Sequence, residues 1–134
     1  MNTLFVKYEA PTVRAFFPHD KRERYVQLLG KSNRRHDALK TMHHEIVFDP
    51  AWSTTVEMNA DVAAILKDKG AGPKAYLIGT SGDGSILPLD DAVACLEKEA
   101  GMLVSIAGKL AYYYGGPGKR RLILERRNPP HEPV

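Results

Sequence analysis

The sequence predicts an α+β fold: a single two-layer domain with a mixed sheet of four or five strands, helices mainly on one face, and a C-terminal antiparallel meander. Two observations predict this class. Residues 74–127 have the pattern of a strand, a glycine turn, a helix and three further strands joined by short turns. Residues 20–69 contain three segments with apolar positions at helical spacing. A chain of 134 residues is long enough to fold as one domain without a metal or a disulfide.

The N-terminal half is predicted to begin with a strand. Leu4, Val6 and Tyr8 fall on alternate positions, which is typical of a short strand. Residues 21–29 then show helical spacing, and a second helix is expected from a Ser32 cap to about residue 44. The first turn of this second helix is basic, which opposes the helix dipole. Residues 45–48 are expected to form a strand, and residues 59–69 a helix capped by Asn59.

The C-terminal half begins with a compact apolar run at residues 75–78, typical of a buried strand. A helix capped by Asp90 and a strand over residues 102–107 follow, and a strand–helix–strand order favours a parallel pair. The connection over residues 79–88 is long enough to contain an extra short strand. Residues 110–114 and 119–126 then complete the meander. Seven side chains from these elements are predicted to be buried: Leu77, Val93, Leu96, Val104, Ile106, Leu122 and Leu124.

The ends of the chain and its cysteine content bear on location. We expect residues 1–127 to form the domain and residues 128–134, which contain three prolines, to form a flexible tail. Residues 1–10 lack the pattern of a signal peptide, and no apolar run approaches the ~20 residues of a membrane span. The only cysteine, Cys95, excludes a disulfide within the chain, which is typical of a reducing compartment. We therefore expect a cytoplasmic protein without a membrane partner.

Basic residues are concentrated at the two ends of the chain. Residues 1–50 contain nine Lys/Arg and six Asp/Glu, residues 51–101 contain four and eight, and residues 102–134 contain six and two. Such asymmetry indicates either a surface for a polyanion or an ordinary solvated face. Arginines around a tyrosine on a sheet can hold single-stranded nucleic acid, because bases stack and phosphates pair. We therefore predict a non-enzymatic nucleic-acid-binding module, with phosphate contacts from Arg34, Arg35, Lys119, Arg120 and Arg121, and with Tyr113 stacking on a base.

The histidines support a different hypothesis, that of a small enzyme. His36, His43 or His44 would act near Ser81 and Asp83 of the glycine-rich turn. His36 and His43 lie about 10 Å apart along a helix, too far to share a metal ion. The sequence therefore predicts no metal site at these histidines. It also predicts no cofactor and no identifiable catalytic residue.

Three structural observations would separate the classes of function. A polar pocket that joins a histidine to Asp83 would favour the enzyme, and a continuous basic face would favour nucleic acid. An exposed apolar strand would favour the third alternative, a protein-interaction or homodimer surface on the strand with tyrosines 112–114.

Four motifs extend over most of the chain: GKSNRR at residues 30–35, GDG at 82–84, LPLDDA at 87–92 and AGKLAYY at 107–113. In these motifs the chain resembles a family of short, uncharacterised bacterial proteins that have no established activity. The resemblance therefore implies no site residues and leaves the function open.

Overall fold

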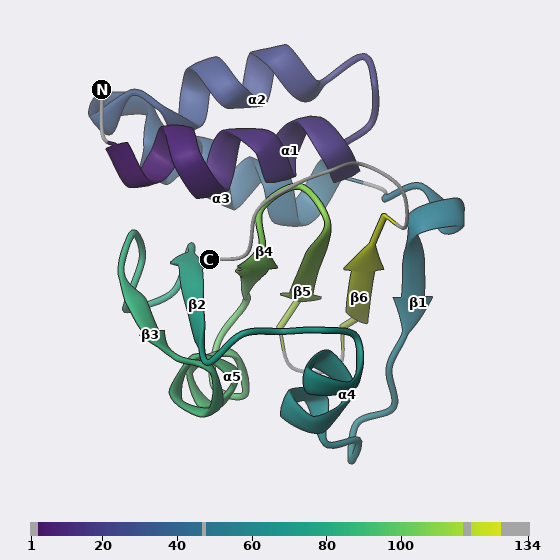
Figure 1. The fold of residues 1–134 in the computed structure, drawn as a ribbon. Coiled ribbons are helices and arrows are strands. Elements are labelled where there is room, and N and C mark those ends of the chain that lie inside the picture. Colours follow the sequence, from purple (N-terminus) through teal and green to yellow (C-terminus); the bar gives the residue numbers. More distant parts are fainter. Residues whose placement is uncertain (1–2, 47, 117–118, 127–134) are drawn as a thin grey trace.

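The sheet and helices were assigned in a computed structural model, which describes residues 3–46, 48–116 and 119–126. Within these residues the chain has a π-helical turn, five α-helices, one 3-10 turn and six strands (Figure 1). In chain order they are η1 (Phe5–Glu9), α1 (Ala10–Phe16), α2 (Arg22–Leu29), α3 (Ser32–Glu45), η2 (Pro50–Trp52), β1 (Ser53–Thr55), α4 (Val62–Asp68), β2 (Lys74–Ile78), β3 (Ile86–Pro88), α5 (Leu89–Leu96), β4 (Gly101–Ile106), β5 (Leu110–Tyr114) and β6 (Arg121–Glu125).

The six strands form one sheet in the order β1-β6-β5-β4-β2-β3, and all the described pairs are antiparallel. This confirms the α+β class and the C-terminal meander. The sheet is not mixed, however, and it has more strands than the four or five expected. The expected parallel pair is wrong because β3 forms inside the connection and pairs with β2, so that Tyr76 lies opposite Ile86. The chain has therefore already reversed direction before α5, and β4 returns antiparallel to β2.

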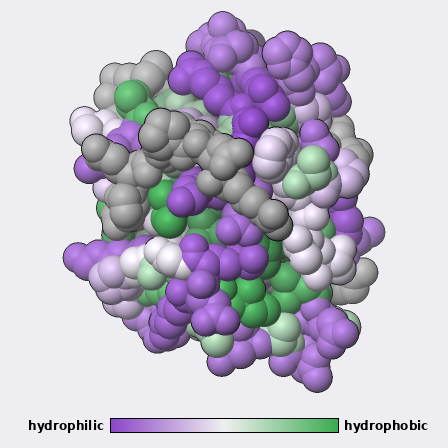
Figure 2. Space-filling view, turned by 45° about the vertical axis from the view of Figure 1, so that its right-hand side comes forward, coloured by the Kyte–Doolittle hydropathy of each residue, from purple (hydrophilic) through white to green (hydrophobic). Residues whose placement is uncertain are grey.

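Helices cover both faces of the sheet, and the molecule has three layers where two were expected. Tyr76 and Ile78 of β2 pack in the cluster that includes α1, α2 and α3, whereas Leu77 between them packs with α4 and α5. The two groups of helices lie above and below the strands in Figure 1. All six residues of β4 are buried, and a strand buried on both sides needs cover on both faces. Figure 2 shows one side of the molecule, where hydrophilic residues cover most of the upper and lower parts and hydrophobic residues are visible near the middle.

The N-terminal segment is helical, so the strand predicted over residues 4–8 is wrong. Phe5 and Tyr8 are buried, whereas Val6 is 51% exposed, and this is helical rather than alternating spacing. The segment contains the π turn η1, in which the N–H of Ala10 bonds to the carbonyl of Phe5. Pro11 follows at once and has no N–H to donate, so the widened turn accommodates a break in the usual bonding pattern.

The remaining elements follow the sequence prediction with small shifts, but Lys31 and Pro88 stand at the cap positions of α3 and α5 where Ser32 and Asp90 were expected, without a side-chain cap bond. The seven predicted core side chains are all buried. No described residue of the predicted strand 45–48 lies in a strand; residue 47 is outside the described residues, and the strand forms later, as β1. The α4 helix is capped by Asp61, whose carboxylate accepts from the N–H of Ala64, rather than by Asn59. The predicted tail, 128–134, lies outside the described residues, and within the described ranges no helix is long and apolar enough to cross a membrane.

Candidate functional site

Two hollows lie along one side of α3 and share the residue His43. The first, which we call the cleft, has a volume of about 580 Å³, and the second, the basic hollow, has about 590 Å³. Residues of α3, the β2–β3 turn and the α5–β4 connection line the cleft: Ser32, Arg35, His36, Leu39, Lys40, His43, Gly79, Thr80, Asp83, Glu99 and Ala100. The end of α3, β5 and the β5–β6 turn line the basic hollow: His43, His44, Tyr113, Gly115, Lys119 and Arg120.

Glycines allow the wall opposite α3 to approach the helix closely. Gly79 has a φ of +78°, and a Cβ there would lie 3.3 Å from the Leu39 side chain, so a larger residue would be strained and would press on α3. A Cβ on Gly116 would lie 3.8 Å from the Cβ of Ala100. The β5–β6 turn therefore continues the wall of the cleft towards the basic hollow.

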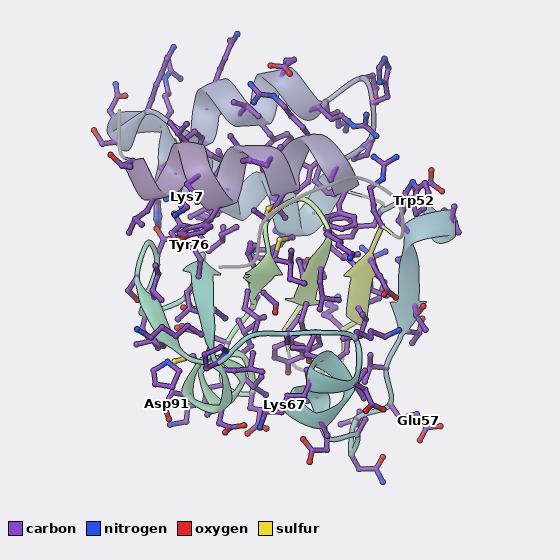
Figure 3. All side chains as sticks on the ribbon, viewed as in Figure 1. Lys7, Trp52, Glu57, Lys67, Tyr76 and Asp91 are labelled. Carbon is purple, nitrogen blue, oxygen red and sulfur yellow. The ribbon has the colours of Figure 1, made fainter. Side chains whose placement is uncertain are left out.

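One end of the cleft is formed by an ionic network centred on Arg35. Its guanidinium makes two hydrogen bonds to Glu9 (2.6 and 2.9 Å), two to Asp83 (2.8 and 2.6 Å) and one to the carbonyl of Leu29 (2.9 Å). These contacts use all five guanidinium N–H donors. The Tyr76 hydroxyl, below the N-terminal helical segment in Figure 3, lies 2.9 Å from the completely buried Glu9 carboxylate.

Burial and charge act against each other within this network. Burial raises the pKa of Glu9 even though Arg35 and Tyr76 bond to its carboxylate. Burial also opposes the ionisation of Asp83, but hydrogen bonds from Arg35 and from the N–H of Gly79 bring its pKa below the ordinary value. The network therefore holds the N-terminal segment, α2, α3, β2 and the β2–β3 turn together. Arg35 has no remaining N–H for a phosphate from outside.

The charges of the basic hollow, unlike those of the Arg35 network, are not neutralised by carboxylates among the described lining residues. No carboxylate belongs to its lining among the described residues, which include His43, His44, Lys119 and Arg120. The Nδ1 atom of His43 lies 3.0 Å from the Tyr113 hydroxyl oxygen. Burial lowers the pKa of His43, and the neighbouring His44 lowers it further. The arrangement suits an anion, because lysine and arginine supply charge while imidazole and phenol groups supply hydrogen bonds.

The residues predicted to contact nucleic acid lie in different places. Lys119 and Arg120 line the basic hollow, but Arg34 lies exposed outside the lining of both hollows. The guanidinium of Arg121 lies 4.8 Å from the centre of the Tyr114 ring, which belongs to the hydrophobic cluster on the α4 and α5 side of the sheet. Arg35 belongs to the ionic network.

Tyr113 lines the basic hollow, but its ring is not exposed for stacking. The residue is 2% exposed, and its ring centre lies 5.1 Å from that of Phe48. Its hydroxyl group contacts His43 at the hollow. The other tyrosines of β5 are also buried, so this strand offers no exposed apolar face for assembly.

The cleft also bears on the enzyme alternative, because it joins two histidines to Asp83. Asp83 is a poor candidate for a general base: both of its carboxylate oxygens accept from Arg35, and one also accepts from Gly79. Among the described residues no group of three His, Cys, Asp or Glu could hold a metal ion.

The sequence contains a signal for the α3 wall of the cleft and the basic hollow. His36, Lys40 and His43 are four and three residues apart, which places them on one helix face. His36 and His43 lie too far apart along the helix to share a metal ion, but this spacing suits side chains that line the length of the cleft.

Comparison of the chain with known protein families, with curated proteins and with solved structures gives no match.

Proposed function

We propose that the protein binds single-stranded nucleic acid and holds a backbone phosphate in the basic hollow. The observation that carries the proposal is the convergence of Lys119 and Arg120 with His43 and His44 around one hollow whose described lining has no carboxylate. A positively charged groove that follows the backbone is the usual basis of binding to single strands.

The groups at the basic hollow have different roles in phosphate binding. Lys119 and Arg120 supply positive charge, and Arg120 is oriented by a bond of 3.1 Å to the carbonyl of Ile46. The Tyr113 hydroxyl and the neutral His43 imidazole bond to each other, and this pair supplies one further hydrogen-bond donor rather than a stacking surface. Phosphate binding therefore needs neither Arg35 nor Arg121.

The test is a salt series of anisotropy titrations with short labelled single-stranded DNA and RNA. Each phosphate contact to a single strand contributes about 0.7 to the slope of log affinity against log salt. Replacing Lys119 and Arg120 by Ala should therefore reduce the slope by about 1.4 and weaken all sequences alike.

The matched control replaces Arg24 of α2 and Lys98, which follows α5; both side chains are exposed and lie outside the lining of the basic hollow. This variant should keep the slope of the unaltered protein. Absence of binding at low salt, or an equal loss of slope in both double variants, would overturn the proposal.

A further inference from the structure

We propose that the cleft binds the nucleoside part of the same nucleotide whose phosphate the basic hollow holds. This inference rests on the proposed function and adds a second site to it. It begins from the position of His43, which lines both hollows. The imidazole contacts Tyr113 through Nδ1, so that Nε2 remains as a second polar atom at the junction.

Opposite α3, the two sites approach each other where the β5–β6 turn meets the α5–β4 connection. The close approach of Gly116 to Ala100 places the β5–β6 turn of the basic hollow beside the lining of the cleft. A phosphate and the sugar to which it is joined can therefore occupy the two hollows, which share His43. The volume of the cleft, about 580 Å³, is in the range of ordinary small-molecule sites, roughly 300–1,000 Å³.

Charge determines which part of a nucleotide each hollow accepts. Glu99 and Asp83 belong to the cleft lining, whereas the described lining of the basic hollow contains no carboxylate. The cleft lining also contains Arg35 and Lys40, so its formal charges balance, and a phosphate is attracted more strongly to the second site than to the first. A nucleoside is neutral, so only the orientation with the nucleoside in the cleft matches both sites.

The chemistry of the cleft also suits a nucleoside. Leu39 and Ala100 provide apolar surface for a base or sugar. The Oε1 atom of Glu99 accepts a hydrogen bond from the backbone N–H of Ser81. A carboxylate can accept further hydrogen bonds, for example from a ribose hydroxyl or a base amino group. His36 and Lys40 add polar atoms from the α3 side.

The test compares inorganic phosphate, adenosine and adenosine monophosphate by calorimetry and by amide shifts in nitrogen-15 spectra. Phosphate should shift the amides around Gly115 and Lys119. The monophosphate should shift these and also the amides of Gly79, Thr80 and Ala100. It should bind at least about tenfold more tightly than phosphate, since it adds hydrogen bonds to a charged group.

The matched variants are Glu99→Gln and Glu97→Gln, which remove one charge each from exposed positions two residues apart. Glutamine can still accept from Ser81, so the first variant should keep its fold. Glu99→Gln should weaken the monophosphate about tenfold and leave phosphate unchanged, because the lost acceptor is charged. Glu97→Gln should change neither, because Glu97 is not part of the cleft lining.

The outcomes separate this inference from the proposed function. If the monophosphate binds no more tightly than phosphate, or if the two variants behave alike, the nucleoside site is overturned while the phosphate site stands. If the labelled oligonucleotides and inorganic phosphate both fail to bind, the proposed function itself is overturned.

Discussion

Arg34 and Arg35 are neighbours with the same side chain, and the structure gives them different surroundings. Arg34 is exposed, whereas the Arg35 side chain is 19% exposed and bonds to Glu9 and Asp83. These partners lie 26 and 48 residues away in the sequence. The local pattern therefore predicts two equivalent cations, and only the tertiary fold distinguishes them.

Replacing Arg35 by Ala should destabilise the protein strongly. The change leaves the Glu9 carboxylate buried without its partner, and removing one member of a buried pair costs about 3–5 kcal/mol. Arg34→Ala is the control and should change the free energy of unfolding by no more than about 0.5 kcal/mol. Urea unfolding followed by circular dichroism measures both. Equal stability of the two variants would show that the network contributes little to the fold.

The pH dependence of stability should contain a contribution from His43. Its pKa is lowered from 6.5 by burial and by His44, so the unfolded chain takes up this proton at a higher pH than the folded protein. The contribution is therefore present above pH 6.5 and is lost as the pH falls through the lower folded value.

The measurement is the unfolding midpoint of the protein and of His43→Gln between about pH 5 and 7.5, a range centred on the ordinary histidine pKa. The difference in stability between the two proteins should shrink as the pH falls. Glu9 acts in the opposite sense, because its raised pKa means that its contribution is lost as the pH rises above 4.5. Since Glu9 is present in both proteins, comparison with the variant isolates His43. Parallel pH profiles would contradict the assignment.

At the scale of elements, α2 to α5 and the longer strands were predictable, and the errors lie in the N-terminal helical segment, which includes α1, and in the short strands. The first segment has apolar residues at both alternating and helical spacing, and burial of Phe5 and Tyr8 with exposure of Val6 decides for the helix. The three residues of β3 contain no internal pattern, and their strand conformation depends on pairing with β2. Because β3 reverses the chain, this short strand determines that β4 runs antiparallel to β2.

The candidate site was predictable only in part, for the same reason. Helical spacing places His36, Lys40 and His43 on one face, and the basic turn that contains Lys119 and Arg120 is visible in the sequence. The sequence does not show that α3 and the β5–β6 turn lie side by side. This arrangement depends on contacts such as that between His43 and Tyr113, which are 70 residues apart.

At the scale of the whole molecule, two hydrophobic clusters share a single sheet. Consecutive residues of β2 belong alternately to the two clusters, and so do those of β5 and β6. The apolar runs in the sequence correctly indicated buried strands, but an uninterrupted run leaves open whether one face or both faces are covered by helices. Because neither cluster can lose its half of the sheet alone, we expect the two to unfold together.

Two natural probes test this expectation, since the chain has one tryptophan and one cysteine. Trp52, at the edge of the sheet in Figure 3, packs against the cluster that contains α1 to α3, whereas Cys95 packs against the cluster of α4 and α5. Tryptophan fluorescence and the rate of cysteine labelling should therefore give the same midpoint in urea.

Leu66→Ala provides the sharper form of the same test. Leu66 is fully buried on the α4 side, and its truncation should cost about 2–5 kcal/mol. In a single cooperative unit this loss lowers the midpoint reported by Trp52, on the far side of the sheet, as much as that reported by Cys95. A shift confined to Cys95 labelling would show that the helices on the two faces unfold independently, and the prediction of one domain over residues 1–127 would then be wrong.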